Sequence, residues 1–140
     1  FIHGVSKVSW LRYGHHIMEG VIKIFGTDIS YIKCCAINHD HEQVSIKYRS
    51  GLTVHLDFVK NINLPIKFNI YFEDSKSMAF EFNNFYISFK RMLEDFIILI
   101  KSNTNIIDVS SMIFLSKLVL AGQKSKSKNG LPVNPEIIEV

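Results

Sequence analysis

Cysteine is nearly absent from this chain, which has two cysteines in 140 residues, the adjacent pair Cys34 and Cys35. The pair falls in a strand-like run, where neighbouring side chains point to opposite faces of a sheet, so we expect one thiol to be a small core residue. A disulfide framework is excluded, and no second pair follows at zinc-ribbon spacing. The triplet from His39 to His41 lies in a polar connection, so we expect a solvated loop there and no metal site.

The chain also lacks a strong charge of one sign and long apolar runs. Its formal net charge is only +3, and basic residues gather only at Lys117, Lys124, Lys126 and Lys128, where they complement the end of a helix dipole. We therefore expect no nucleic-acid partner. The longest apolar stretches fall short of the roughly 20 residues that a membrane span needs, and no signal peptide precedes them. We expect a cytoplasmic protein that does not contact a membrane.

A glycine-rich nucleotide loop is missing as well. No Gly-x-Gly-x-x-Gly follows a strand, and no βαβ pattern occurs. The chain therefore has no turn that could hold the pyrophosphate of a dinucleotide at a helix N-terminus. We expect this chain alone to bind neither NADH nor NADPH.

The composition that remains is typical of one globular domain. With 47% hydrophobic and 21% charged residues, 140 residues suffice for one core but not two, so we expect a single domain over residues 1–140. Runs rich in Ile, Val, Tyr, Phe and Thr predict strands at residues 30–37, 44–48, 52–58, 67–72 and 78–82. Gly51 predicts a hairpin turn with positive φ. Apolar and polar residues alternate in 52–58, so one sheet face is buried and the other is open.

Helical periodicity predicts one helix before the strands and two after them. The first carries His15 and His16 in its opening turn, after Gly14, where the helix dipole would keep an imidazole neutral. The second has an apolar stripe, which we expect to pack on the core. The third is capped by Asp108 or Ser110. The stripe of the second helix consists of Phe89, Met92, Leu93, Phe96, Ile97 and Ile100.

Four pieces of sequence occur in a recognisable order. They are Gly14-x-His16-x-x-Glu19 followed by Gly26, the hairpin with Gly51, Phe89-x-x-Met92-Leu93-x-Asp95-Phe96, and Ala121-Gly122-x-x-Ser125 followed by Gly130-x-Pro132-Val133. Over nearly the whole chain they resemble the C-terminal domain of the Gfo/Idh/MocA family of NAD(P)-dependent oxidoreductases. The resemblance implies an α+β fold, with an open-faced, mainly antiparallel sheet and helices packed on one face. It also implies a substrate pocket and a homodimer formed through the open sheet face.

The resemblance also implies site residues. His16 takes the position of the active-site histidine, and Glu19, one helical turn on, would hold its ring. Arg12, Tyr13 and His15 complete the expected substrate-binding set. Many family members carry aspartate where this chain has Arg12, and a guanidinium there favours a carboxylate or phosphate ligand. In the alternative interpretation, His16 is a core histidine packed beneath the sheet.

The family's nucleotide-binding half is absent, as is its main catalytic lysine in a Glu-Lys-Pro context. We therefore expect the substrate-binding and dimerisation domain of an NAD(P)-dependent oxidoreductase, which acts on a small molecule and whose Rossmann domain lies upstream or in a separate polypeptide. The complete enzyme would use NAD or NADP, whereas this chain alone would bind no cofactor and be inactive. The alternative is a non-enzymatic, stand-alone domain for self-association or small-molecule binding.

Overall fold

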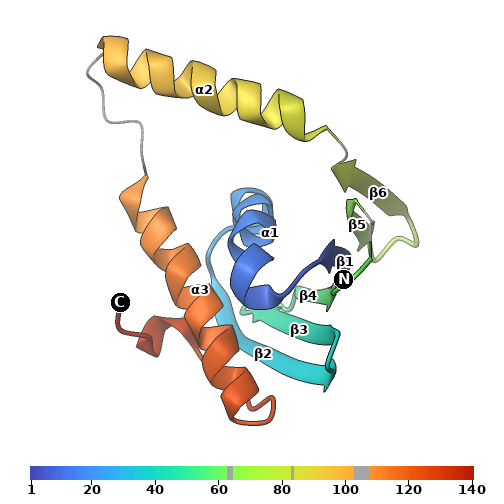
Figure 1. Cartoon of the computed structure of the whole chain (residues 1–140). Helices are drawn as coiled ribbons and strands as arrows, with labels where there is room; N and C mark the ends of the chain where they lie inside the picture. The colour runs from blue at the N-terminus through green and yellow to red at the C-terminus, as the bar shows by residue number, and fades with distance from the viewer. Residues whose placement is uncertain (63–64, 83, 103–107) are drawn as a thin grey trace.

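The computed structural model describes residues 1–62, 65–82, 84–102 and 108–140 (Figure 1). In chain order, its elements are β1 (Ile2–Lys7), α1 (Trp10–Phe25), β2 (Ile29–Asn38), β3 (His41–Tyr48), β4 (Thr53–Val59), β5 (Ile66–Tyr71), β6 (Ser77–Phe82), α2 (Phe85–Ser102), α3 (Val109–Ser127) and the short 3-10 helix η1 (Pro135–Ile137). All five predicted strands are present, within three residues of their expected ends. Gly51 has the positive φ expected of the hairpin turn.

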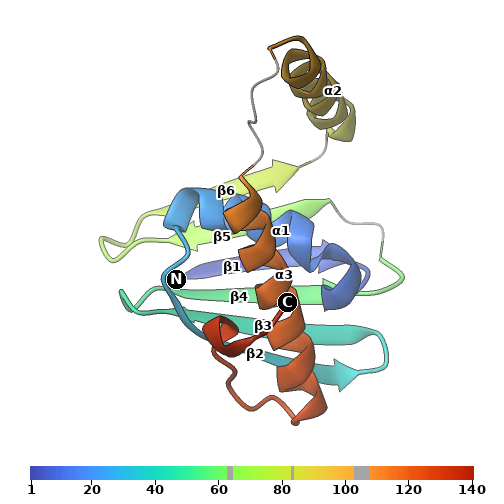
Figure 2. The same cartoon turned by 90° about the vertical axis from the view of Figure 1, so that its left-hand side faces the viewer.

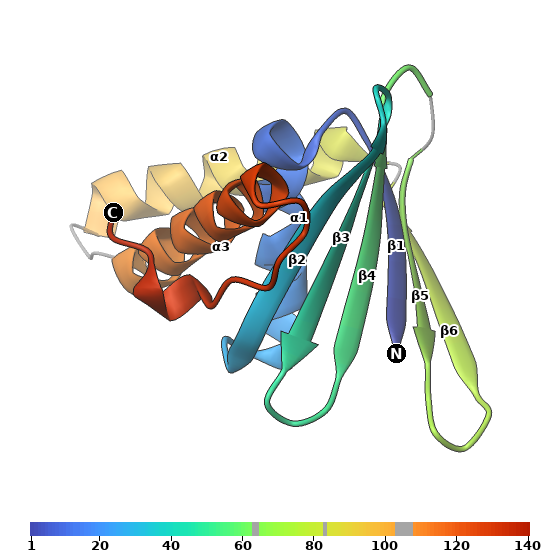
Figure 3. The same cartoon turned by 90° about the horizontal axis from the view of Figure 1, so that it is seen from below.

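The strands form one open sheet in the order β2-β3-β4-β1-β5-β6 (Figure 2). The β1–β4 pair is parallel, and every other neighbouring pair is antiparallel. Helices α1 and α3 lie on the same side of this sheet, as the view from below shows (Figure 3). The predicted α+β fold, with an open and mainly antiparallel sheet, is confirmed.

Strand β1, in the middle of the sheet, is an element that the sequence analysis missed. Its residues alternate between buried and half-buried, but two of the three buried positions are Gly4 and Ser6. Those small side chains give almost no hydrophobic signal. Gly4 is needed there because a Cβ would come within 2.9 Å of the Leu56 and Phe68 side chains.

Helix α1 begins five residues earlier than predicted, at Trp10. His15 and His16 therefore lie in its second turn, and the prediction that they occupy the opening turn and its dipole field is wrong. Gly14 suggested a helix boundary in the sequence, but it lies inside α1. The indole ring of Trp10 packs against it, and a Cβ at Gly14 would come 2.9 Å from Trp10 Cε3.

Trp10 joins α1 to α3. Its side chain is fully buried, and its Nε1 donates a hydrogen bond of 3.0 Å to the carbonyl oxygen of Val119. Its ring meets Phe58 edge-on, with the centroids 5.5 Å apart. The backbone of Gly122 lies so close that a Cβ there would be 2.2 Å from Trp10 Nε1.

Glu42 on β3 is a buried carboxylate that connects three elements. It accepts a hydrogen bond of 2.8 Å from the Trp10 backbone N–H at the start of α1, and another from Lys126 Nζ on α3. Burial by itself would raise the pKa of Glu42, but these two hydrogen bonds and the positive charges of Lys126 and Lys60 together outweigh it, and the pKa is lowered. Ser9, the N-cap residue, makes no side-chain cap bond, so Glu42 satisfies this end of α1 in its place.

Helix α3 packs against β2. Asp108, rather than Ser110, is the N-cap of α3, and it accepts a hydrogen bond from the Ser111 backbone N–H. Cys34 is fully buried, as expected for one of the two thiols, and burial raises its pKa to about 12. Its backbone N–H donates to Ser125 Oγ on α3.

The prediction that α2 packs on the core is wrong. Its apolar stripe exists as expected, but the side chains are 43% to 64% exposed, and no other described helix or strand packs along the helix. In Figure 1, α2 stands apart from the sheet and spans from β6 towards the start of α3, above α1. The described part of the chain therefore leaves the stripe uncovered.

Candidate functional site

A hollow of about 720 Å³ lies between α1 and the first half of α3. Its volume is in the range of small-molecule sites. The floor is apolar, with Ile22, Met112 and Leu115, while polar groups stand around it. The polar lining residues are His15, His16, Glu19, Lys23, Thr27, Asp108, Ser111 and Ser116.

His16 stands between this hollow and a second one of about 480 Å³. The second hollow lies on the other side of α1, against β5, the end of β6 and the first turn of α2. Tyr13 lines it, and the Tyr13 ring meets His16 edge-on with the centroids 5.4 Å apart. Glu19 also lines both hollows. Helix α1 therefore presents four of the five predicted site residues, Tyr13, His15, His16 and Glu19, to ligand-sized spaces.

The expected geometry within that set differs from the observed one in two respects. Glu19 accepts a hydrogen bond of 2.7 Å from Lys23 Nζ, rather than one from the His16 ring. Arg12 is exposed and lines neither hollow. His15 and His16 both line the first hollow, so the structure does not select one of them. His16 is exposed, which excludes the alternative of a core histidine beneath the sheet.

Asp108 is a lining residue that the sequence analysis treated only as a helix cap. Hydrogen bonds from the Ser110 and Ser111 hydroxyls and the Ser111 backbone N–H lower the pKa of Asp108 to about 2. It is therefore an anion at neutral pH, at the rim of the hollow opposite the histidines of α1. No periodicity could reveal this, because the two helices are far apart in sequence.

The first hollow thus offers imidazole rings on one wall and a fixed carboxylate on the other. Imidazole can donate or accept a hydrogen bond, and a carboxylate only accepts. Serine and threonine hydroxyls add groups of both kinds. This mixture suits the hydroxyl groups of a small ligand, because each hydroxyl both donates and accepts.

The open face of the sheet carries a second polar cluster, around Asp57 of β4. His3 on β1 and His41 on β3 each donate from Nε2 to a different oxygen of Asp57, both at 2.7 Å. Burial by itself would raise the pKa of Asp57, but these bonds, with one from Gln43, lower it below 3.8. His41 thus belongs to the sheet face and not to a solvated loop. The predicted alternation in β4 is confirmed.

His55, which lies on the same open face of β4 as Asp57, hydrogen-bonds through Nδ1 to Ser45 Oγ at 2.8 Å. Burial and the neighbouring charge of His3 lower the pKa of His55 below 6.5, while Asp57 opposes them. The ring of Phe1 packs beside it, with the centroids 5.2 Å apart. Protonating His55 therefore costs more in the folded chain than in the unfolded one.

We expect His55→Gln to flatten the pH dependence of stability. As pH falls below 6.5, the unfolded chain binds the proton of His55 first, so the wild type loses stability until pH passes the lower folded pKa. Glutamine does not titrate and can still bond Ser45. Urea unfolding at about pH 7.5 and about pH 5 measures the difference. Parallel losses in the two proteins would show that His55 is not responsible.

Among the residues that the structure describes, no three His, Cys, Asp or Glu side chains are placed to hold a metal ion. The Nε2 atoms of His3 and His41 are already engaged by Asp57. No described helix is long and apolar enough to cross a bilayer.

Comparison with known proteins finds no matching family model, no matching curated protein and no matching solved structure.

Proposed function

We propose that the hollow between α1 and α3 binds a small hydroxylated molecule, and that this domain is the substrate-binding part of an NAD(P)-dependent oxidoreductase. The Rossmann domain of that enzyme would be supplied by a segment or polypeptide outside this sequence. One observation carries the proposal: His15, His16 and Glu19, selected from sequence, all line one hollow of suitable size.

The charges around the hollow favour a neutral polyol over an acid. Arg12, which led to the expectation of a carboxylate or phosphate ligand, lies outside the lining. Lys23 is paired with Glu19, and Asp108 adds a permanent negative charge. An anionic ligand would therefore meet at least as much negative as positive charge, and a neutral hydroxylated molecule would not be repelled.

His16 is the residue proposed to move a proton. The nicotinamide cofactor of such an enzyme takes the hydride, and this chain contributes a base for the substrate hydroxyl proton. An imidazole suits that role near neutral pH. Its edge contact with Tyr13 restricts the ring, and its exposure leaves it accessible to a ligand.

Xylitol, a neutral polyol, serves as the test ligand. We expect His16→Ala to weaken its binding by about tenfold or more, because the ligand loses a hydrogen-bonding wall of the hollow. Amide chemical shifts in a two-dimensional NMR titration would measure this, with Ser111 and Lys23 as reporters on opposite walls. In the complete enzyme the same variant should lower turnover by roughly a hundredfold. His15→Ala should do much less to turnover.

Xylonate is the matched control ligand, because it differs from xylitol mainly by its carboxylate. The proposal requires weaker shifts with xylonate. It is contradicted if neither compound moves the Ser111 and Lys23 amides at millimolar concentration, or if His16→Ala lowers only the melting temperature and leaves turnover per folded molecule unchanged.

One observation favours the alternative, a stand-alone domain that binds a small molecule without chemistry. Glu19 engages Lys23, so no described carboxylate holds the His16 ring in the orientation that a base needs. Binding of xylitol by the wild type without any detectable oxidation of xylitol would support this alternative.

The resemblance also implies a homodimer through the open sheet face, and this remains a proposal. The side chains of that face bond to one another, from His3 through Asp57 to His41 and from Ser45 to His55. Their mutual bonding satisfies them in a monomer as well as in a dimer. The apolar stripe of α2, by contrast, is not covered by any other described element.

A further inference from the structure

The apolar stripe of α2 is the largest apolar surface on the described helices that nothing covers. It runs the length of an 18-residue helix, which is about 27 Å at the rise of an α-helix. Tyr86 extends the predicted stripe by one turn. The stripe then consists of Tyr86, Phe89, Met92, Leu93, Phe96, Ile97 and Ile100, all of them at least 43% exposed. Monomeric proteins rarely leave a contiguous apolar patch of this size in water.

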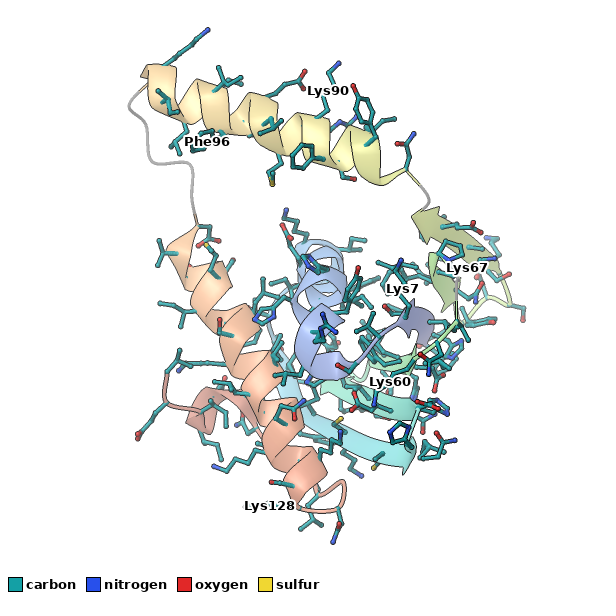
Figure 4. The ribbon with its side chains drawn as sticks, viewed as in Figure 1. Lys7, Lys60, Lys67, Lys90, Phe96 and Lys128 are labelled. Atoms are coloured by element: carbon teal, nitrogen blue, oxygen red, sulfur yellow. The ribbon has the colours of Figure 1, made fainter. Side chains whose placement is uncertain are left out.

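The stripe faces the rest of the chain, but no described element of the chain covers it. Figure 4 shows Phe96 on the side of α2 turned towards the body of the protein and Lys90 on the opposite side. The element beneath α2 is α1, whose exposed side chains include the charged or polar Arg12, His15 and Lys23 beside the apolar Leu11 and Ile24. Closing α2 onto α1 would bury these charged and polar groups against hydrocarbon.

Two further apolar patches flank the stripe, one at each end of α2. On β6, Met78 and Phe80 pair across the strands with Ile70 and Phe68, on the sheet face that carries the helices, and they are 48% and 41% exposed. At the start of α3, Val109 and Ile113 are 54% and 46% exposed. The described chain thus presents a helix stripe with an apolar patch near each of its ends.

We propose that the occupant of this surface is a second copy of the same chain, packed stripe to stripe with α2 antiparallel to α2 of its partner. A two-fold axis near the middle of the helix brings the same surface of both copies together. Each copy's flanking patches on β6 and α3 then meet the ends of the partner helix. The hydrophobic effect drives this association because both surfaces are exposed in the monomer.

The exposed area is sufficient for a stable dimer. A large apolar side chain at half exposure contributes about 100 Å², so the seven stripe residues offer about 700 Å² from each copy. Two copies bury about 1,400 Å² through the stripes, within the range of specific protein interfaces. The flanking patches on β6 and α3 add to that area.

The polar side of α2 argues against a membrane as the occupant. Helices that lie in an anionic bilayer surface are rich in Lys and Arg on the polar face. Here Lys90, Arg91 and Lys101 are nearly balanced by Glu94 and Asp95, and Lys90 pairs with Glu94 at 3.7 Å. The helix therefore has little electrostatic attraction for acidic lipid, while its apolar stripe suits an equally apolar protein surface.

Sedimentation velocity of the full chain at roughly 10–100 μM should show a dimer, and Phe96→Glu should raise its dissociation constant by about tenfold or more. Because no described element packs along α2, Phe96→Glu should leave the melting temperature unchanged when both proteins are measured at a concentration where the wild type is monomeric. The matched control is Arg91→Glu, a new glutamate on the polar side of the same helix, which should leave the dimer intact. As a second measurement, Leu93→Cys, near the middle of α2, should form an intermolecular disulfide under oxidation, whereas Lys90→Cys should not.

Three outcomes would overturn the proposal. The first is a wild-type monomer throughout this concentration range. The second is a dimer that persists in Phe96→Glu but is lost in Thr53→Glu, which would place the interface on the open sheet face. The third is a monomeric wild type that binds phosphatidylcholine–phosphatidylserine vesicles in a manner that Phe96→Glu abolishes. None of these results bears on xylitol binding, so the two proposals are tested independently.

Discussion

Gly122→Ala is expected to destabilise the domain by about 3 kcal/mol, a large part of the stability of a chain of this size. The new Cβ would lie 2.2 Å from Trp10 Nε1, and neither group is at the end of a flexible side chain. To make room, the indole must give up its hydrogen bond to Val119 or α3 must move off the core. Urea unfolding followed by far-UV circular dichroism measures the loss.

The matched control is Gly20→Ala, also a helical glycine. A Cβ at Gly20 meets nothing within 4 Å. Alanine restricts the unfolded chain and favours the helix, so this variant should gain roughly 0.5–1 kcal/mol. Equal effects of the two substitutions would mean that close packing against Trp10 does not limit residue 122.

Lys126→Met is expected to cost about 2 kcal/mol at neutral pH, because it removes the charged partner of Glu42 and leaves that carboxylate buried. The side chain of Glu42 is only 6% exposed, while that of Lys126 is 34% exposed. The loss should therefore fall below the roughly 3–5 kcal/mol of a fully buried pair. The Trp10 backbone N–H still donates to Glu42, so the fold should persist.

The pH dependence identifies the cause of that loss. In the wild type the pKa of Glu42 lies below 4.5, so Glu42 stabilises the fold above that pH and the contribution is lost as pH falls through the lower folded pKa. In Lys126→Met, fewer groups oppose the rise that burial causes in the pKa of Glu42. Protonation of Glu42 at low pH then removes its unpaired charge. The gap between the two proteins should therefore narrow from about pH 7 to about pH 4.

Lys124→Met provides the comparison on the same helix. Lys124 is exposed, and its substitution should change stability by no more than about 0.5 kcal/mol at either pH. A gap that stays constant with pH in Lys126→Met would indicate lost packing of the lysine stem instead of an uncompensated carboxylate.

The sequence predicts the fold well wherever the local pattern and the final environment agree. Strand β4 shows this, because its alternation of apolar and polar residues corresponds to the buried and open faces of the sheet. Strand β1 could not be found in this way, since Gly4 and Ser6 occupy its core positions. For α2, periodicity predicts a stripe correctly, but it carries no information about the surface that covers the stripe.

The candidate site was only partly predictable for a related reason. His16 and Glu19 are three residues apart on one helix, so their common face follows from helical geometry. The start of α1 did not follow, because Gly14 reads as a helix boundary unless the Trp10 ring against it is known. Asp108 reaches the same hollow from α3, and such a meeting depends on the packing of distant helices.

The place of β1 in the sheet has a consequence for how the chain folds. Strands β2, β3 and β4 form consecutive hairpins, and so do β5 and β6, but these two groups share no hydrogen bonds because β1 lies between them. Strand β1 therefore pairs with segments about 50 and nearly 70 residues later in the sequence, and such distant pairings are slow to form. Until then its neighbours β4 and β5 each expose an unpaired edge to other chains. We therefore expect β1 to insert late in folding, and the sheet is continuous only after that step.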